Sequence, residues 1–250
     1  MNGTKTDEIE VCEYLPWDTG FFEFNIARVN SNRLTFQRLR DVLDWCKEKE
    51  IKCLYFLADS DHAETVELAE EHGFHLIDIR VTLTRKTGSE GIDPENQTRD
   101  LYIRSSTNED IPVLKVIAQS SFELSRFYYD PGFSREACKA FYETWIERSC
   151  TGYADAVFVA ELNGQLRGFI SCHLSDTPIL NRIGLLGVSN QFKGHGLGRE
   201  LVRFSLNWFD KQGASMVSVV TQGRNVPAQH LYQKCGFLIS SVQLWYHKWL

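Results

Sequence analysis

The feature that most constrains the fold is the segment from Ile183 to Asp210, which reads IGLLGVSNQFKGHGLGRELVRFSLNWFD. Residues 183–188 form an apolar run of strand length, and a glycine-rich turn follows at once. Beyond the turn, apolar residues recur at helical spacing, which predicts an amphipathic helix from about Gly196 to Lys211. The predicted apolar stripe consists of Leu197, Leu201, Phe204 and Trp208. A strand that turns through glycines into a helix is typical of α/β proteins that bind anions.

Three glycines stand at the start of this helix, at Gly194, Gly196 and Gly198. Without side chains in the way, consecutive main-chain N–H groups can approach an anion, and the helix dipole adds positive potential. The nearby cationic side chains are Lys193, His195, Arg199 and Arg203. The arrangement suits a pyrophosphate, although three spaced glycines are equally compatible with a turn that binds nothing.

Two other phosphate-binding patterns do not fit. A dinucleotide fold has Gly-x-Gly-x-x-Gly, with an acidic residue roughly 20 positions later at the end of the next strand. Here the spacing is Gly-x-Gly-x-Gly, and the next predicted strand ends at Thr221-Gln222. A Walker loop needs Gly-Lys followed by Ser or Thr, which the sequence lacks. The turn therefore indicates a different class of phosphate-containing ligand.

Charge and composition exclude several functions. With 27 basic and 33 acidic residues the net charge is -6, so local groups must hold any anion, and we expect no nucleic-acid partner. The seven histidines and seven cysteines lack the spacing of a metal site, so we expect no metal. No run approaches the roughly 20 apolar residues of a membrane span, and residues 1–9 lack a signal-peptide core. We therefore expect a cytoplasmic protein without a membrane partner.

The chain is predicted to contain two domains and a linker. Residues 86–99, KTGSEGIDPENQTR, are rich in Gly, Pro and polar residues and separate an α/β domain at 1–85 from a larger domain at 100–250. The first domain is expected to have strands around 9–14, 26–29, 51–58 and 76–83, a helix at 35–48, and a helix that Asp61 caps and Gly73 ends.

The second domain is predicted to have similar elements in greater number. Strands are expected at 101–105, 157–162, 166–173, 183–188, 216–221 and 238–249, with a tight hairpin at Asn163-Gly164. Helices are expected after Asp110, at about 134–148, at 196–211 and at 227–234. The order helix, Gly-Phe, strand occurs at both Gly73-Phe74 and Gly236-Phe237. A duplicated fold and a chance recurrence are equally compatible with so short a match.

Two motifs resemble those of the GCN5-related N-acetyltransferase (GNAT) superfamily. The segment Gln191-Phe192-Lys193-Gly194-His195-Gly196 is similar to its Gln/Arg-x-x-Gly-x-Gly/Ala signature, with a strand before it and a helix after it. A second set of residues resembles the superfamily's second motif in residue type and spacing: Asn225, Ala228, Leu231, Tyr232, Lys234, Gly236 and Phe237. The resemblance covers 101–250. It implies an α+β sandwich, the GNAT fold, with a mixed central sheet flanked by helices and a smaller, degenerate GNAT-like domain before it.

The resemblance implies an acetyl-CoA-dependent N-acetyltransferase in which the acceptor amine attacks the thioester directly. The strand at 185–188 would pair with the pantetheine arm, the amide of Val188 would polarise the thioester carbonyl, and the glycine turn would hold the pyrophosphate. Asn225 would bond to the pantetheine or to the neighbouring backbone. The residues implied in coenzyme binding are Leu186, Gly187, Val188, Gln191, Phe192, Lys193, Gly194, His195, Gly196, Leu197, Gly198, Arg199, Asn225, Ala228 and Tyr232.

Tyr232 is the implied general acid. A phenol with a pKa of about 10 can protonate a leaving thiolate whose thiol has a pKa of about 8.5. The position also suits a half-buried aromatic residue on a helix. No base is assigned: His173 and Glu123 are candidates, and a water chain would serve an amine of low basicity.

A closer resemblance spans both predicted domains and concerns bacterial enzymes that acetylate the amino group of a dTDP-linked amino-deoxysugar. It rests on Trp17-Asp18-Thr19-x-Phe21-Phe22, Ser125-Arg126-Phe127, Phe141-Tyr142-x-x-Trp145-Ile146, Arg182-Ile183-Gly184-Leu185-Leu186 and Leu206-Asn207-Trp208. It implies a nucleotide amino sugar as the small-molecule substrate, and a homodimer. Arg126, Phe127 and Tyr128 are candidate substrate contacts, but the two rings are equally compatible with a place in the core.

Two other functions stay open at this point. An N-acetyltransferase of protein termini, lysines or small amines would use the same coenzyme turn with a different acceptor groove. A non-catalytic acyl-CoA-binding sensor would bind the coenzyme without turnover, and the presence of Tyr232 argues against it.

Overall fold

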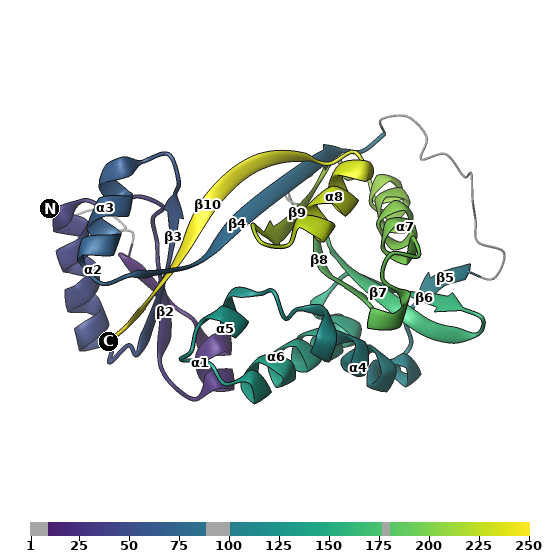
Figure 1. Cartoon of the computed structure of the whole chain (residues 1–250), viewed down its shortest axis with the longest axis horizontal. Helices are drawn as coiled ribbons and strands as arrows, with labels where there is room; N and C mark the ends of the chain where they lie inside the picture. Colours follow the sequence, from purple (N-terminus) through teal and green to yellow (C-terminus); the bar gives the residue numbers. More distant parts are fainter. Residues whose placement is uncertain (1–9, 89–100, 177–180) are drawn as a thin grey trace, which may run out of the picture. The chain divides into compact units, whose positions relative to one another are not determined.

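The computed structural model describes residues 10–88, 101–176 and 181–250, which divide into two compact units (Figure 1). The first unit comprises the chain up to Arg80 together with Val242–Leu250, and the second comprises Val81–Ser241. This division differs from the predicted limits at 85 and 100, because the end of the last strand pairs with a strand of the first unit. Residues 1–9 and most of the predicted linker, 89–99, lie outside the described residues.

In the first unit, helices accompany a mixed sheet with the strand order β1-β2-β3-β10. Strands β2 and β3 are parallel, whereas β1 is antiparallel to β2 and β10 to β3. The elements are β1 (Cys12–Tyr14), α1 (Pro16–Phe22), β2 (Ile26–Val29), α2 (Phe36–Glu48), β3 (Cys53–Asp59), α3 (Ala63–Glu71), the start of β4 (His75–Lys86) and the end of β10 (Leu238–Trp249). The apolar positions Leu39, Val42 and Cys46 of α2 are buried in the core of this unit.

In the second unit the strand order is β10-β4-β9-β8-β7-β6-β5. Strands β5 to β8 are antiparallel neighbours, and β8 is parallel to β9. Besides parts of β4 and β10, the strands are β5 (Leu101–Ser105), β6 (Ala156–Leu162), β7 (Gln165–His173), β8 (Asn181–Val188) and β9 (Met216–Gln222). The helices are η1 (Asn108–Asp110), α4 (Ile111–Ser121), α5 (Arg126–Tyr129), α6 (Arg135–Arg148), η2 (Ser149–Tyr153), η3 (Asn190–Phe192), α7 (Leu197–Lys211) and α8 (Val226–Lys234).

Helices cover both faces of the sheet in the second unit (Figure 1). On one face α7 packs against β6, β7 and β8, and a Cβ added to Gly168 of β7 would lie 3.1 Å from the Leu201 side chain. On the other face α4 packs against β7 and β8, and a Cβ added to Gly187 of β8 would lie 3.1 Å from Ser121 Oγ. The predicted α+β sandwich with a mixed sheet is confirmed.

Local turns and caps agree with most of the predictions. Asn163 and Gly164 have φ values of 52° and 71°, the left-handed pair that a tight hairpin requires. The helix predicted to be capped by Asp61 begins later. Its cap is the ring of His62, which accepts a hydrogen bond from the Thr65 N–H, so the prediction of Asp61 was wrong.

The buried face of α7 differs from the predicted stripe. Leu197 and Leu201 are buried as predicted, whereas Phe204 is 37% exposed and packs edge-on against Phe158. Val202, Leu206 and Phe209 are buried as well. The buried face is wider than one stripe because α7 contacts α8 in addition to three strands.

The chain contains an internal structural repeat. The bounds of β3, α3 and β4 recur 163 residues later as the bounds of β9, α8 and β10. Both helices end in the same turn: Gly73 and Gly236 have φ values of 73° and 80°, and the N–H of the following Phe74 or Phe237 donates to the carbonyl five residues earlier. The Gly-Phe echo is therefore part of a duplicated fold.

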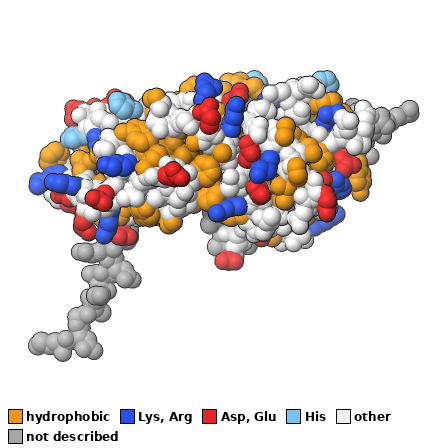
Figure 2. Space-filling view, turned by 90° about the horizontal axis from the view of Figure 1, so that it is seen from below, with side chains coloured by type: hydrophobic (Ala, Val, Ile, Leu, Met, Phe, Trp, Pro, Cys, Tyr) orange, Lys and Arg blue, Asp and Glu red, His pale blue; other side chains and the backbone are white. Residues whose placement is uncertain are grey.

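Acidic and basic side chains are interspersed on the face of the molecule shown in Figure 2, with hydrophobic and uncharged side chains between them. This face carries no extended basic surface, in keeping with the net charge of -6. Across residues 10–88, 101–176 and 181–250, every helix falls short of the length and apolarity that crossing a bilayer requires.

Candidate active site

Strands β8 and β9 are paired over part of their length. The pairing joins Asn181–Ile183 to Val217–Val219, whereas β8 continues to Val188 and β9 to Gln222. Directly after Ile183, β8 contains a β-bulge in which two of its residues, Gly184 and Leu185, face the single residue Ser171 of β7. Bulges bend the strand that carries the extra residue. Within the described residues, the edge of β8 from 184 to 188 therefore has no pairing with β9.

Hydrogen bonding shows which main-chain groups of β8 face this unpaired edge. The N–H of Ser189 donates to the Arg167 carbonyl of β7, 2.8 Å away. Because directions alternate along an antiparallel strand, the N–H groups of Leu186 and Val188 point away from β7, toward the side of β9. This is the orientation that the role predicted for Val188 requires.

The turn from β8 to α7 is open. Gly194 and Gly196 both have φ of 84°, a left-handed conformation that favours glycine, and a Cβ added to either would meet no atom within 4 Å. Gly196 is the N-cap of α7, and no side chain caps this helix. The N–H groups of Leu197, Gly198 and Arg199 lack carbonyl partners inside the helix, as in any first helical turn. The turn presents these donors at the positive end of the helix dipole.

Gly198 has a packing role in addition to the one predicted for its N–H. A Cβ at this position would lie 3.2 Å from Leu231 Cδ2 of α8 and 3.9 Å from Val188 Cγ2 of β8. Gly198 thus permits close packing of α7, α8 and the end of β8. This contact brings the two predicted motifs together.

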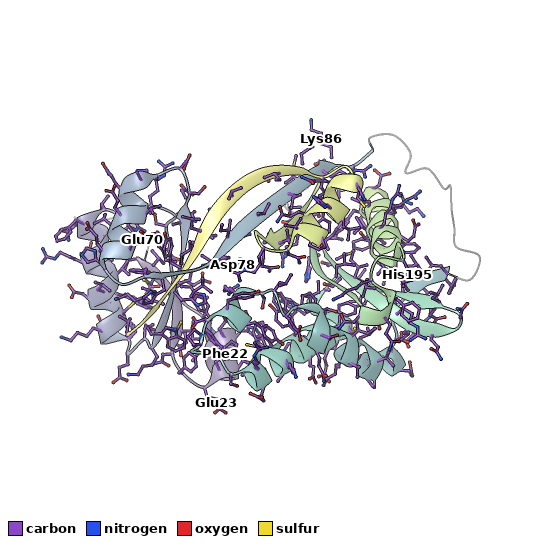
Figure 3. The ribbon with its side chains drawn as sticks, in the orientation of Figure 1. Phe22, Glu23, Glu70, Asp78, Lys86 and His195 are labelled. Carbon is purple, nitrogen blue, oxygen red and sulfur yellow. The ribbon has the colours of Figure 1, made fainter. Side chains whose placement is uncertain are left out.

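The cationic side chains near the turn fall into two groups. Lys193, His195 and Arg199 are exposed, and His195 lies in the turn that precedes α7 (Figure 3). Arg203 is 9% exposed, and its Nη1 lies 3.5 Å from Glu200 Oε1, so a carboxylate already offsets its charge. An anion at the turn would therefore meet Lys193 and Arg199 more directly than Arg203.

Arg167 on β7 is a residue near the turn that sequence reasoning missed. Its guanidinium carbon lies 4.3 Å from the centroid of the Phe192 ring, and it donates a hydrogen bond to the Gln165 side chain. The stack holds η3, the short helix that contains the exposed Gln191, against β7. Finding Arg167 from the sequence would have required the register between β7 and β8.

Tyr232 on α8 is 5% exposed, and its ring packs edge-on against Phe237. Burial raises the pKa of its phenol above the ordinary value. The phenol therefore stays protonated at neutral pH, as a general acid must, but its pKa lies further from that of a thiol than the sequence argument assumed. The neighbouring Leu231 contacts Gly198, so Tyr232 lies on the helix that flanks the glycine turn.

Asn225 shapes the start of α8. Its Oδ1 accepts a hydrogen bond from the Ala228 N–H at 3.2 Å, so the side chain bonds to the neighbouring backbone, one of its two predicted roles. Gln229 Nε2 donates to the carbonyls of Gln222 and Gly223, at 3.1 and 2.9 Å. These bonds fix α8 to the end of β9.

The three predicted substrate contacts on α5 have different surroundings. Phe127 is 2% exposed and packs against Phe133 and Phe141, which agrees with a place in the core. The guanidinium carbon of Arg126 lies 4.2 Å from the centroid of the Phe127 ring. Tyr128 is partly buried, and burial raises its pKa to about 12.

Tyr129, the next residue of α5, was not predicted and is exposed. The guanidinium carbon of Arg224 lies 3.6 Å from the centroid of its ring. Arg224 belongs to the turn between β9 and α8, so this stack brings α5 to the carboxyl end of β9. No spacing in the sequence links the two residues.

His173 is a poor candidate for the base. It is 4% exposed and packs edge-on against Tyr153, and burial, reinforced by the charge of Arg182, lowers its pKa to about 4. So weak a base takes up few protons at neutral pH. Glu123 is exposed beyond the end of α4, and no base is assigned.

Comparison with known proteins finds a family model that matches part of the chain and relatives that match most of it. Residues 119–237, which contain the glycine turn and α8, match the model of the acetyltransferase (GNAT) family. The dTDP-fucosamine acetyltransferase of Escherichia coli O6:H1 is 29% identical over 239 residues, which are 94% of this chain and 97% of that protein. The spore coat polysaccharide biosynthesis protein SpsD of Bacillus subtilis is 29% identical over 133 residues, which are 53% of this chain and 45% of that protein.

A solved structure shares the fold. The GCN5-related N-acetyltransferase from Sphaerobacter thermophilus matches with a TM-score of 0.67 at 12% identity, over 95% of this chain and 76% of that chain. At that identity the likeness shows the fold alone. With the family match over 119–237 and the relatives named above, the chain is an N-acetyltransferase enzyme that contains a GNAT domain.

Proposed function

We propose that this protein transfers the acetyl group of acetyl-CoA to the amino group of a dTDP-linked amino-deoxysugar. The open turn at 194–196 carries the coenzyme part of the proposal, because uncapped main-chain donors lie there with no side chain in front of them. The acceptor part is supported by similarity to a dTDP-fucosamine acetyltransferase over 94% of the chain.

The residues of the turn fit the pyrophosphate of coenzyme A. The N–H groups of Leu197, Gly198 and Arg199 would donate to its oxygens, and Lys193 and Arg199 would offset its charge. The N–H groups of Leu186 and Val188 would bind the pantetheine arm and the thioester carbonyl at the unpaired edge of β8. Asn225 and Ala228 would support the arm indirectly, by fixing the start of α8.

Acetyl transfer needs polarisation of the carbonyl, a place for the amine proton, and a proton for the leaving sulfur. In this proposal the Val188 N–H polarises the carbonyl. The Tyr232 phenol gives its proton to the sulfur, and water takes up the proton of the amine. The position of Tyr232 on α8 supports its part, because its neighbour Leu231 packs at Gly198 beside the glycine turn.

The acceptor is proposed to lie along α5. Arg126 and Tyr128 supply a cation and a phenol, and Tyr129 joins them through its stack on Arg224 at the end of β9. Phe127 would support the acceptor site from the core, since its ring is buried. An N-acetyltransferase of peptides or other small amines would share the coenzyme turn and differ along α5.

The test is an assay of coenzyme A release with a panel of acceptors: dTDP- and UDP-linked amino sugars, simple amines and peptides. We expect the highest kcat/KM with a dTDP-linked amino-deoxysugar. A higher value with a peptide or a plain amine would replace the proposed acceptor. Binding of acetyl-CoA without turnover of any acceptor would favour a sensor.

We further propose a cytoplasmic homodimer. All seven cysteines are free thiols, which suits a reducing compartment. Light scattering of the purified protein would check the oligomeric state, and a monomeric mass would refute that part.

A further inference from the structure

We propose that Ser171 is a positioning residue for acetyl transfer, which acts by holding the bulge of β8. The proposal rests on the function proposed above in one respect only: it takes the main chain of β8 beyond the bulge as the group that contacts the thioester. Ser171 itself belongs to β7 and is fully buried, so it is not a catalytic residue.

The bulge interrupts the regular pairing of β7 with β8. Cys172 faces Ile183 and Ile170 faces Leu186, so Gly184 and Leu185 lie opposite Ser171 alone. The Ser171 hydroxyl accepts a hydrogen bond from the Leu185 N–H at 2.8 Å, in a fully buried position. A buried N–H needs a partner, and here a side chain supplies it.

The surroundings of the bulge are packed closely around this hydroxyl. A Cβ added to Gly184 would lie 2.7 Å from Ser171 Oγ and 2.5 Å from His173 Nε2. The absence of a side chain at Gly184 therefore lets Ser171 and His173 approach β8. Both side chains lie against the main chain of β8 at Gly184, which limits the positions open to the Ser171 oxygen.

The position of the bulge connects Ser171 to the site. The last pair between β8 and β9 is Ile183 with Val219, and the bulge follows immediately. The N–H groups of Leu186 and Val188, one and three residues beyond Leu185, point toward the unpaired edge. Ser171 therefore fixes the direction in which β8 leaves β9, and with it the donors that would bind the thioester.

The test is Ser171→Ala, assayed with the best acceptor of the panel, whichever class that acceptor belongs to. We expect kcat to fall at least about tenfold, because small misplacements of oriented groups are costly in the transition state. The Kd of acetyl-CoA should change less than kcat, since the glycine turn is untouched. Hydrogen exchange of the Leu185 amide, followed by NMR, should speed up, and Ser171→Thr, which keeps the hydroxyl, should restore protection and most of kcat.

Ser149→Ala is the matched control. Ser149 is also buried in the second unit, and its hydroxyl donates to the Trp145 carbonyl at 2.9 Å at the end of α6. We expect Ser149→Ala to lower stability without changing kcat. Equal kinetics for Ser171→Ala, Ser149→Ala and the wild type would overturn the proposal, as would unchanged exchange at Leu185. Failure of every amino sugar as acceptor would refute the proposed acceptor but leave the Ser171 comparison intact, because the comparison is read with any acceptor that turns over.

Discussion

The turn between β8 and α7 and the turn between β2 and α2 occupy equivalent places in the internal repeat, and they are built in opposite ways. In the second unit the turn is exposed, rich in glycine and without a side-chain cap. In the first unit Thr35 caps α2 by accepting a hydrogen bond from the Arg38 N–H at 3.2 Å. Leu34 is buried beside it, and Arg33 forms an ion pair with Asp59.

The two turns also differ in length. Ala27 faces Leu54 in the first unit, and Asn181 faces Val217 in the second, an offset of 154 along β2 and β8. The following helices begin at Phe36 and Leu197, an offset of 161, so the first unit has seven fewer residues between strand and helix. The additional residues of the second unit lie in the bulge, the end of β8 and the glycine turn. The same scaffold thus carries both versions, and we expect coenzyme binding to depend on this short insertion.

The largest effect is expected from a substitution of Tyr232, whose equivalent in the first unit is Ala69. Tyr232→Phe should lower kcat about 100-fold or more with little change in the Kd of acetyl-CoA, because only the proton donor is removed. The control is Tyr102→Phe, which changes an exposed tyrosine of β5. Normal turnover by Tyr232→Phe would remove the phenol from the mechanism.

The next effect concerns the acid stability of the second unit. Folding lowers the pKa of His173 to about 4 through burial and the charge of Arg182, with Asp155 acting in the opposite direction, whereas an unfolded histidine has a pKa of about 6.5. The unfolded state therefore binds more protons between these values, and stability is lost as pH falls from about 6.5 to 4, by up to about 3 kcal/mol.

Urea unfolding at pH 7 and pH 4.5 would measure this loss. His173→Gln should show a smaller loss between the two pH values, and His230→Gln, a change at an exposed position of α8, should behave as the wild type. Hydrogen exchange should show that the amides that lose protection at acid pH lie in β7 and β8. An identical pH dependence in all three proteins would contradict the prediction.

A reciprocal exchange of caps tests the two turns directly. Gly196→Thr places a β-branched residue at φ of 84° and should weaken acetyl-CoA binding about tenfold or more, because the strained turn reshapes the donors. Thr35→Gly removes the cap of α2 and should cost a few tenths of a kcal/mol of stability. Isothermal titration with acetyl-CoA would show no change for Thr35→Gly if the first unit takes no part in binding.

The smallest effect concerns the ion pair of the first turn. Asp59→Asn removes the partner of Arg33, whose side chain is 57% exposed, and should cost about 0.2–1 kcal/mol of stability. Kinetic constants should stay at wild-type values. A loss of acetyl-CoA affinity in Asp59→Asn would show that the turn between β2 and α2 affects coenzyme binding.

The element order, the duplicated Gly-Phe turn and the glycine loop were predictable, because each depends on residues close together in the sequence. The bulge of β8 was not, since it appears only when Gly184 and Leu185 are set against Ser171 in the sheet. The distinct role of Gly198 required the position of Leu231 on another helix.

The limits of the first unit likewise depend on residues far apart in the sequence, because β10 pairs with β3. Nothing local in residues 243–249 indicates pairing with β3 in preference to another strand. The stacking of Arg224 on Tyr129 is likewise a contact between elements far apart in the chain. Sequence patterns report local geometry and burial well, but they carry little information on such long-range partners.

The pairing of β10 with β3 has a consequence for synthesis on the ribosome. Gln243 follows its partner Asp59 by 184 residues, and translation proceeds at about 5–20 residues per second. For roughly 10–40 seconds, the nascent first unit must therefore wait with one side of β3 uncovered, a strand edge of the kind that chaperones shield.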